Sequence, residues 1–141
     1  MAKYHGRLTE VYIEDSGATI RDISLDCNSV ETPKTADTAE VSGFTDTTKK
    51  YVAGLQDSQI RIGGNFNDAA NKSHAVFSGL IGGTAGRRVD VYPRGSASGA
   101  PVFRGSITVS EYSVQSAIGG AVTWSVNLIP FDTNAPTWIT A

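Results

Sequence analysis

The chain has 141 residues and a mass of 14.9 kDa, which predicts a single domain spanning residues 1–141. Glycine, serine and threonine together account for 43 residues, so residues that suit turns and strands stand where a helical protein would carry Ala, Leu, Glu and Lys. A net charge of −2 excludes a strongly basic surface that would hold nucleic acid. Because the chain has one cysteine, it cannot form an internal disulfide. It contains no long apolar run, so we expect no membrane segment and no signal peptide.

Apolar and polar residues alternate with a period of two near the N-terminus, which predicts strands. Residues 8–14 form the first expected strand and residues 19–27 the second, and turn-forming residues that end in Gly17 lie between them. We expect these two strands to pair as a hairpin. Three apolar side chains of the second strand fall on one face: Ile23, Leu25 and Cys27.

Residues 28–50 fit neither the helical nor the strand period. They are rich in threonine, contain Pro33, and hold few large apolar side chains: Val30, Val41 and Phe44. We therefore predict a long polar loop at about 28–50, with a short strand near 40–44. Long loops inside compact domains usually carry function or become ordered on a partner.

Charge is divided unequally along the chain. Residues 1–46 contain nine acidic and four basic residues, whereas residues 47–141 contain five acidic and eight basic ones. Copies stacked head to tail would bring unlike charge together, although scattered solvated charge with no consequence is the alternative interpretation. Candidate subunit-contact residues lie in and beside the loop: Asp37, Glu40, Phe44, Asp46, Lys49 and Lys50.

The middle of the chain contains one strand pattern and the only helix pattern. Residues 59–66 alternate, and the pair Gly63 and Gly64 indicates a bulge or a close approach of another backbone. Apolar residues then recur at spacings of three and four, which predicts a helix at about 68–82 with Phe77 on its buried face. We expect this helix to be capped at its start by Asn67 or Asp68 and to end at Gly82-Gly83.

Three further strands are expected at residues 87–93, 102–115 and 121–131. The apolar parity of the long middle one switches, which predicts a bulge near Ser110. Its turn to the last strand contains Gly119-Gly120, so these two should form a hairpin. One helix among about six strands predicts a mainly β fold, an antiparallel β-sandwich or barrel with one flanking α-helix.

The sequence contains no catalytic signature. His5 and His74 are the only histidines, and neither lies in a recognisable nucleophile motif. The segment 95–99 has Ala97 where a nucleophile elbow needs serine, and the glycine-rich segment 79–88 follows a helix instead of preceding one. We therefore expect no enzyme activity, no metal and no cofactor.

Several phrases, taken in order, resemble the major tail tube protein of long-tailed, non-contractile bacteriophages. The resemblance covers roughly residues 8–131. The phrases that carry it are Ala39–Asp46, Lys49–Asp57, Gly64–Asp68 entering the helix with His74, Val89–Pro93, Phe103–Gly105, Tyr112–Val114, and Gly119-Gly120 with Val122–Val126.

This resemblance implies a β-sandwich or barrel subunit that forms hexameric rings, stacked into the hollow tail tube of a virion assembled in the host cytoplasm. The inner sheets of a ring would join into one barrel around an acidic lumen, through which viral DNA passes without specific binding. The resemblance gives residues 28–50 a role in ring-to-ring contacts. It also implies a tape measure protein in the lumen, tail terminator and distal tail proteins as partners, and no membrane.

A second class of function stays open. Another β-rich virion module would have much the same composition: a head-to-tail connector, the tube of an injection system, or a carbohydrate-binding module.

Overall fold

The computed structural model describes residues 3–141, which fold into ten strands, one α-helix and two short 3-10 turns. In chain order they are η1 (Gly6–Leu8), β1 (Glu10–Glu14), β2 (Ile20–Asp22), η2 (Ser24–Asp26), β3 (Cys27–Glu31), β4 (Lys34–Glu40), β5 (Tyr51–Ser58), β6 (Ile60–Asn65), α1 (Ser73–Leu80), β7 (Arg87–Tyr92), β8 (Pro101–Gln115), β9 (Thr123–Pro130) and β10 (Thr137–Thr140). The predicted class, mainly antiparallel β with one helix, is confirmed.

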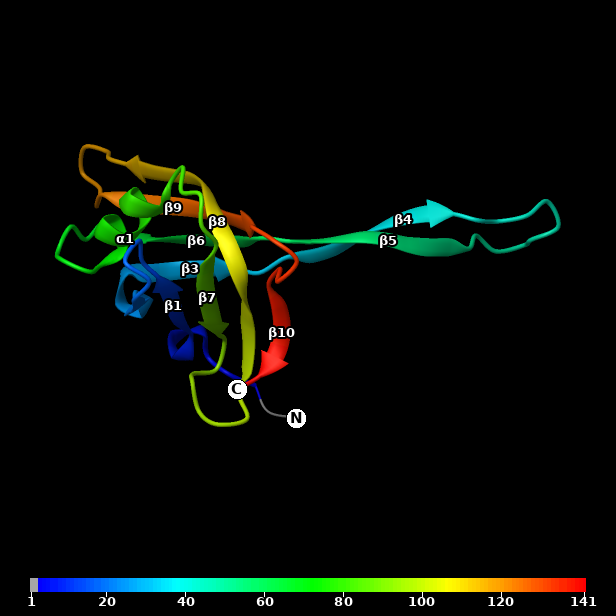
Figure 1. The fold of residues 1–141 in the computed structure, drawn as a ribbon, viewed down its shortest axis with the longest axis horizontal. Helices are drawn as coiled ribbons and strands as arrows, with labels where there is room; N and C mark the ends of the chain where they lie inside the picture. The colour runs from blue at the N-terminus through cyan, green and yellow to red at the C-terminus, as the bar shows by residue number, and fades with distance from the viewer. Residues whose placement is uncertain (1–2) are drawn as a thin grey trace.

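Eight of the strands form one bent sheet. Seven of them follow the order β2-β1-β7-β8-β9-β6-β3, and the eighth, β10, pairs with β8. The long strand β8 connects two parts of this sheet (Figure 1). Its first part pairs with β7 and β10, and its second part pairs with β9. The register of β8 against β9 shifts between Val109 and Glu111, so the bulge predicted near Ser110 is confirmed. A bulge bends a strand, which allows one strand to serve both parts.

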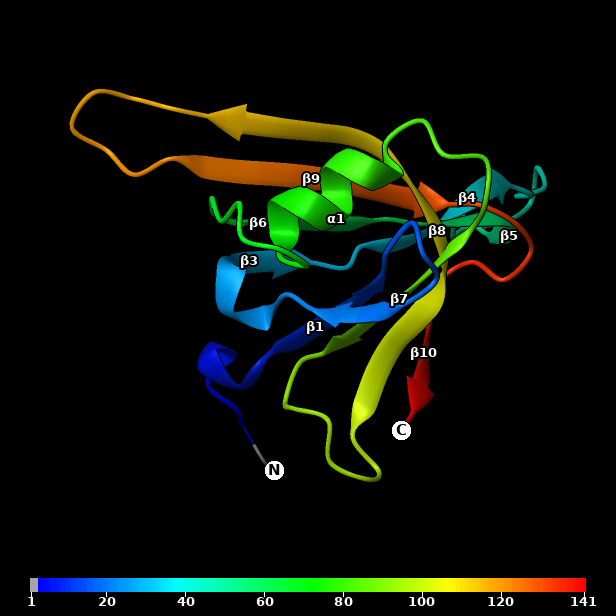
Figure 2. The ribbon, with the colours of Figure 1, turned by 60° about the vertical axis from the view of Figure 1, so that its left-hand side comes forward.

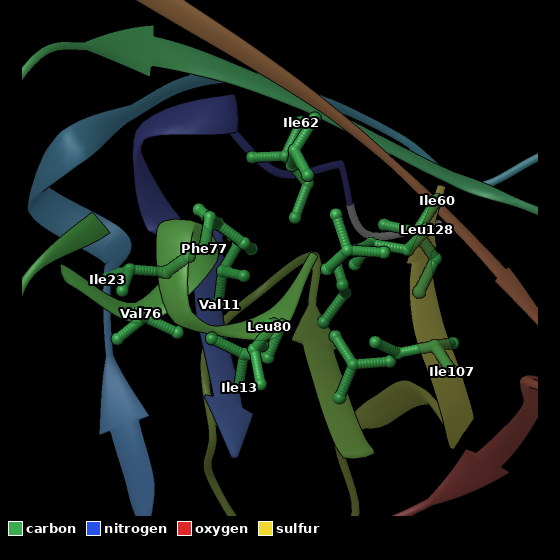
Figure 3. Packing of buried hydrophobic residues seen from close by; sticks show 14 of the residues in the cluster. Val11, Ile13, Ile23, Ile60, Ile62, Val76, Phe77, Leu80, Ile107 and Leu128 are labelled. Atoms are coloured by element: carbon green, nitrogen blue, oxygen red, sulfur yellow. The ribbon is translucent and has the colours of Figure 1, made fainter. Parts of the chain in front are cut away.

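Helix α1 covers the concave side of the sheet, and its apolar residues meet those of the strands there (Figure 3). Phe77 is fully buried, as predicted, with its ring centroid 5.2 Å from that of Trp124. The buried apolar cluster draws on every part of the body: Val11, Ile13, Ile23, Ile60, Ile62, Val76, Phe77, Leu80, Val89, Val91, Phe103, Ile107, Val109, Trp124, Val126 and Leu128.

The helix is shorter than the predicted range 68–82, and its start is capped differently. The side chain of Asn67 accepts the N–H of Ala69 and so stabilises a turn ahead of the helix. The cap comes from Asp26, whose Oδ2 accepts the N–H of Ser73 (3.1 Å) and whose Oδ1 accepts Nδ2 of Asn67 (3.0 Å). Local sequence could not indicate this cap because Asp26 is distant in the chain. Gly82 follows the helix with φ of 74°, in agreement with the predicted end.

The predicted N-terminal hairpin is present, but its second strand is shorter than the predicted range 19–27. β1 pairs with β2 as expected. β2 ends at Asp22, whose carboxylate accepts both the N–H and the hydroxyl of Ser24 and so starts the turn η2. That turn rotates Leu25 outward, where it is 95% exposed instead of sharing a buried face with Ile23.

The prediction of a long polar loop at about 28–50 is wrong. Residues 27–31 form β3, and β4 pairs with β5 as a separate two-stranded sheet, so within the predicted loop only residues 32–33 and 41–50 lack regular strand structure. We call residues 34–58 the arm. Threonine-rich sequence favours strands, but nearly every arm residue is exposed, so neither face produces the alternation by which strands are recognised. The short strand predicted near 40–44 is wrong as well: residue 40 is the last of β4, and residues 41–44 belong to the turn.

The glycine pair marks a close backbone approach, as predicted. A Cβ atom on Gly64 would collide with the backbone carbonyl of Asp26, so no side chain fits there. Opposite this position β3 carries a register shift between Cys27 and Ser29. Gly64 thus allows β3 to pack as the last strand of the sheet.

Candidate functional site

His74 and Cys27 have side chains of reactive type, and both make contacts within the folded body. Nδ1 of His74 lies 3.0 Å from the hydroxyl of Tyr112, and burial raises the pKa of that tyrosine. Burial also raises the pKa of the Cys27 thiol to about 12, so it is a poor nucleophile. Within residues 3–141 no group of three His, Cys, Asp or Glu side chains is placed to hold a metal ion. No helix in that range is long and apolar enough to span a bilayer.

The arm is the most unusual surface of the molecule. It projects well beyond the body (Figure 1), and every residue of β4 and β5 except Ser58 is exposed. An isolated two-stranded hairpin is marginally stable in water, and this arm gains almost no stability from burial within its own chain. Its large apolar side chains are also exposed: Val41, Phe44, Tyr51, Val52 and Leu55.

The tip of the arm is an ordered turn that displays an aromatic ring. Oδ2 of Asp46 accepts the N–H of Gly43, and Oδ1 lies 3.1 Å from Nζ of Lys50. The Gly43 N–H and the Lys50 ammonium hold the pKa of Asp46 below its usual range. Phe44 lies within this turn and its side chain is fully exposed.

All six residues predicted to contact other subunits lie on the arm, and they fall into two groups. Asp46 and Lys50 hold the turn together, while Phe44 and Lys49 are displayed by it. The other two lie on β4: Glu40 pairs with Tyr51 on β5, and Asp37 lies at a register shift. No strand was predicted at residues 51–58, which form β5 and complete the arm.

Within the part of the chain that the structure describes, free sheet edges include those of β3 and of the second part of β8. β3 is the last strand of the sheet and pairs only with β6. β8 pairs with β7 no further than Ile107, so one edge of its second part, residues 109–115, has no neighbour. Unpaired strand edges carry backbone donors and acceptors that can bind another strand. Edges are created by the tertiary fold, so sequence periodicity could not reveal them.

The face of β3, β6, β9 and β8 that points away from α1 is polar. Glu31, Arg61, Asn127 and Glu111 form one row across the four strands. Arg61 and Glu31 make an exposed ion pair of 3.4 Å. A shallow hollow of about 360 Å³ lies on this face, where the side chains are small: Ser29, Gly63 and Ser125. Sequence alternation could define strand faces only relative to one another, whereas the position of α1 shows which face points away from the core.

No protein-family model and no curated protein matches the sequence. Solved structures do match the fold. A tail of an empty gene transfer agent particle, refined with C6 symmetry, superposes with a TM-score of 0.72 at 14% identity, covering 99% of both chains. The SPP1 tail tube superposes with a TM-score of 0.77 at 8% identity, covering 99% of this chain and 80% of the other. A chain of the anti-feeding prophage baseplate gives 0.74 at 8% identity, covering 99% and 97%. This chain therefore has the fold found in phage tail tubes.

Proposed function

We propose that the protein is the structural subunit of a tail tube, without enzyme activity, and that it forms hexameric rings that stack into a hollow tube in a phage-type virion tail. The observation that carries the proposal is the arm, an extended hairpin exposed on both faces and attached to a tail tube fold. A subunit with such an arm reaches its full burial only beside other copies. The likeness to a tail with C6 symmetry supports the ring.

Ring closure uses the free edges of β3 and β8. β3, β6, β9 and β8 alternate in direction, because each adjacent pair is antiparallel. β8 therefore runs opposite to β3, and a copy rotated about the ring axis presents its β8 edge antiparallel to β3. Repeating this contact joins the sheets into one closed barrel, which removes the exposed edges.

The polar face of these strands then lines the channel. The opposite face packs against α1 and cannot face a lumen. Glu31, Arg61 and Glu111 give this face a net charge of −1 per subunit, and small side chains surround them. A weakly acidic wall repels the DNA backbone and offers no base contacts, so DNA passes without specific binding. The tape measure protein would occupy the same channel, and the terminator and distal tail proteins its ends.

The arm makes the contacts between stacked rings. Its exposed apolar residues supply area to bury, and Phe44 at the tip supplies an aromatic anchor. Asp37, Glu40 and Lys49 supply charge that selects the orientation of the neighbour.

Electron microscopy of the purified chain tests the proposal. Negative-stain images should show rings at low concentration and tubes at high concentration. A chain that stays monomeric at high concentration, with its β-rich circular dichroism intact, would contradict the proposal.

The likeness to the anti-feeding prophage baseplate favours one alternative, an inner tube subunit of a contractile injection system. Both functions need the same ring and the same arm. They differ in the partner outside the tube, because a contractile system has a sheath. A sheath gene beside the gene for this chain, and binding of the sheath protein to preformed tubes, would favour the alternative.

A further inference from the structure

We propose that, in the ring proposed above, the turn end of the β8–β9 hairpin of one copy docks beside β3 of the next, where Val114 and Ile118 cover Leu25 and a groove lined by both apolar and polar residues. The inference rests on the proposed ring and names the side chains that hold it together.

The groove runs along the free edge of β3. Its volume is about 420 Å³, and its far wall is made by the start of β1 and the end of β7. The lining includes apolar side chains on both walls: Val11, Val30, Val91 and Pro93. Beside a free strand edge, a slot of this kind can accept side chains from a strand that pairs with the edge.

The β8–β9 hairpin carries the exposed apolar side chains that would enter this groove. Figure 2 shows its turn end projecting beyond α1 and the rest of the body. Val114, near the free edge of β8, is 43% exposed, and Ile118 in the turn is fully exposed. Apart from the arm, the other large apolar side chain that is almost wholly exposed is Leu25, at 95% in η2. Burying each of these side chains against another copy is favourable.

The strand register places the turn end of the hairpin level with the groove, measured along the strands. Cys27, Gly64, Trp124 and Val114 form one row across the four strands. Cys27 lines the groove on one edge of the sheet, and Val114 lies on the opposite edge. A rotated copy therefore brings the end of its hairpin to the end of β3 at which η2 and the groove lie.

Charge argues for a stagger between the two edges. Glu31 and Glu111 end another row, so pairing without a stagger would place two carboxylates opposite each other, which is unfavourable. Closed barrels require a stagger, and a shift by an even number of residues keeps each face on its own side. Such a shift, in the direction that moves the hairpin toward β3, places Ile118 beside residues 25–28, at the end of η2 and the start of β3.

Cross-linking in assembled tubes tests the contact. Two double variants, I118C with L25C and I118C with N28C, cover the range of staggers, and I118C with S78C is the control because Ser78 is exposed on α1. Cys27 can stay, since its protonated, half-buried thiol reacts slowly near neutral pH. Tubes are treated with a short bismaleimide, quenched, and analysed on a denaturing gel. A ladder of covalent oligomers from either test variant, and none from the control, is the expected result.

The outcomes separate this contact from the proposed function. Tubes that form normally but give no ladder with either test variant would overturn the docking contact and leave the tail tube intact. A wild-type chain that forms no rings would overturn both. As a second measurement, Ile118→Asp should leave soluble, folded monomers with no rings, and normal rings from that variant would also contradict the contact.

Discussion

The arm and the β6–β9 pair are both antiparallel two-stranded units, yet they differ in what stabilises them. β6 alternates between buried and exposed residues, and its partner β9 buries Trp124, Val126 and Leu128. β4 has no buried residue, and β5 has one. In the body, regular strands accompany burial within the chain. In the arm, the strands pair through their backbones with almost no burial within the chain, and in the proposed tube other copies supply that burial.

The difference has a direct energetic consequence. Each fully buried Ile, Leu or Phe side chain contributes roughly 1.5–3 kcal/mol to folding, and the body contains many of them. The arm should contribute little to the stability of the monomer and, in the proposed tube, much to that of the assembly. Substitutions in the body should therefore change the free energy of unfolding, whereas substitutions in the arm should change assembly.

Phe77→Ala should have the largest effect, lowering the free energy of unfolding by about 3–5 kcal/mol through loss of buried area and a cavity beneath α1. Urea denaturation of the monomer measures it. Ser78→Ala, at the exposed neighbouring position, is the control and should shift the midpoint little. An unchanged midpoint in the Phe77 variant would mean that the body does not depend on this core.

Asp26→Ala should lower the free energy of unfolding by about 1–3 kcal/mol, because the N–H of Ser73 and the amide of Asn67 would lose their acceptor. Thermal denaturation followed by circular dichroism measures the loss. The matched control is Asp68→Ala, since Asp68 is the cap that the local sequence suggests and is exposed in the structure. A larger loss from Asp68→Ala would contradict the long-range cap.

Cys27 should make stability depend on alkaline pH. The folded thiol keeps its proton up to pH about 12, whereas the unfolded thiol loses it near 9.0. Between these values the unfolded state binds fewer protons than the folded state, so stability should fall as pH rises. Denaturation at several pH values should show a shallower fall in Cys27→Ala than in the wild type, and identical slopes would contradict the buried, neutral thiol.

Phe44→Ser and Leu55→Ser should change the free energy of unfolding by less than about 0.5 kcal/mol, because both side chains are already exposed in the monomer. Electron microscopy should nevertheless show rings that do not stack into long tubes. The control is Thr47→Ser in the same turn, which should assemble normally. Loss of monomer stability in either variant would show that the arm is covered within its own chain.

Reversal of charge on β4, with Asp37→Lys and Glu40→Lys together, should leave the fold unchanged and shorten the tubes. Asp46 is retained because it holds the turn at the tip. The distribution of tube lengths in micrographs is the measurement, and raised salt should reduce the difference from the wild type. Equal tube lengths at low salt would leave these charges without a role in stacking.

Sequence periodicity identified the parts of the fold that have one covered face. The helix with Phe77, the bulge near Ser110 and the β8–β9 hairpin were all visible as alternation or as spacings of three and four. β4 and β5 were not visible, because exposure on both faces removes the pattern. β10 was also missed, since its four residues are all exposed. The six predicted contact residues were brought together on one element, although that element is a hairpin and not the expected loop.

By itself the sequence determined the β-rich class, the single helix, the lack of a catalytic signature and the resemblance to tail tube proteins, since these depend on composition and local order. The tertiary structure decided which edges are free, which face is polar and outside, and that Asp26 caps a helix that starts at Ser73. It also decided that the side chains of Leu25, Val114 and Ile118 are exposed. These features depend on pairing between strands that are distant in sequence, and no local pattern records that pairing.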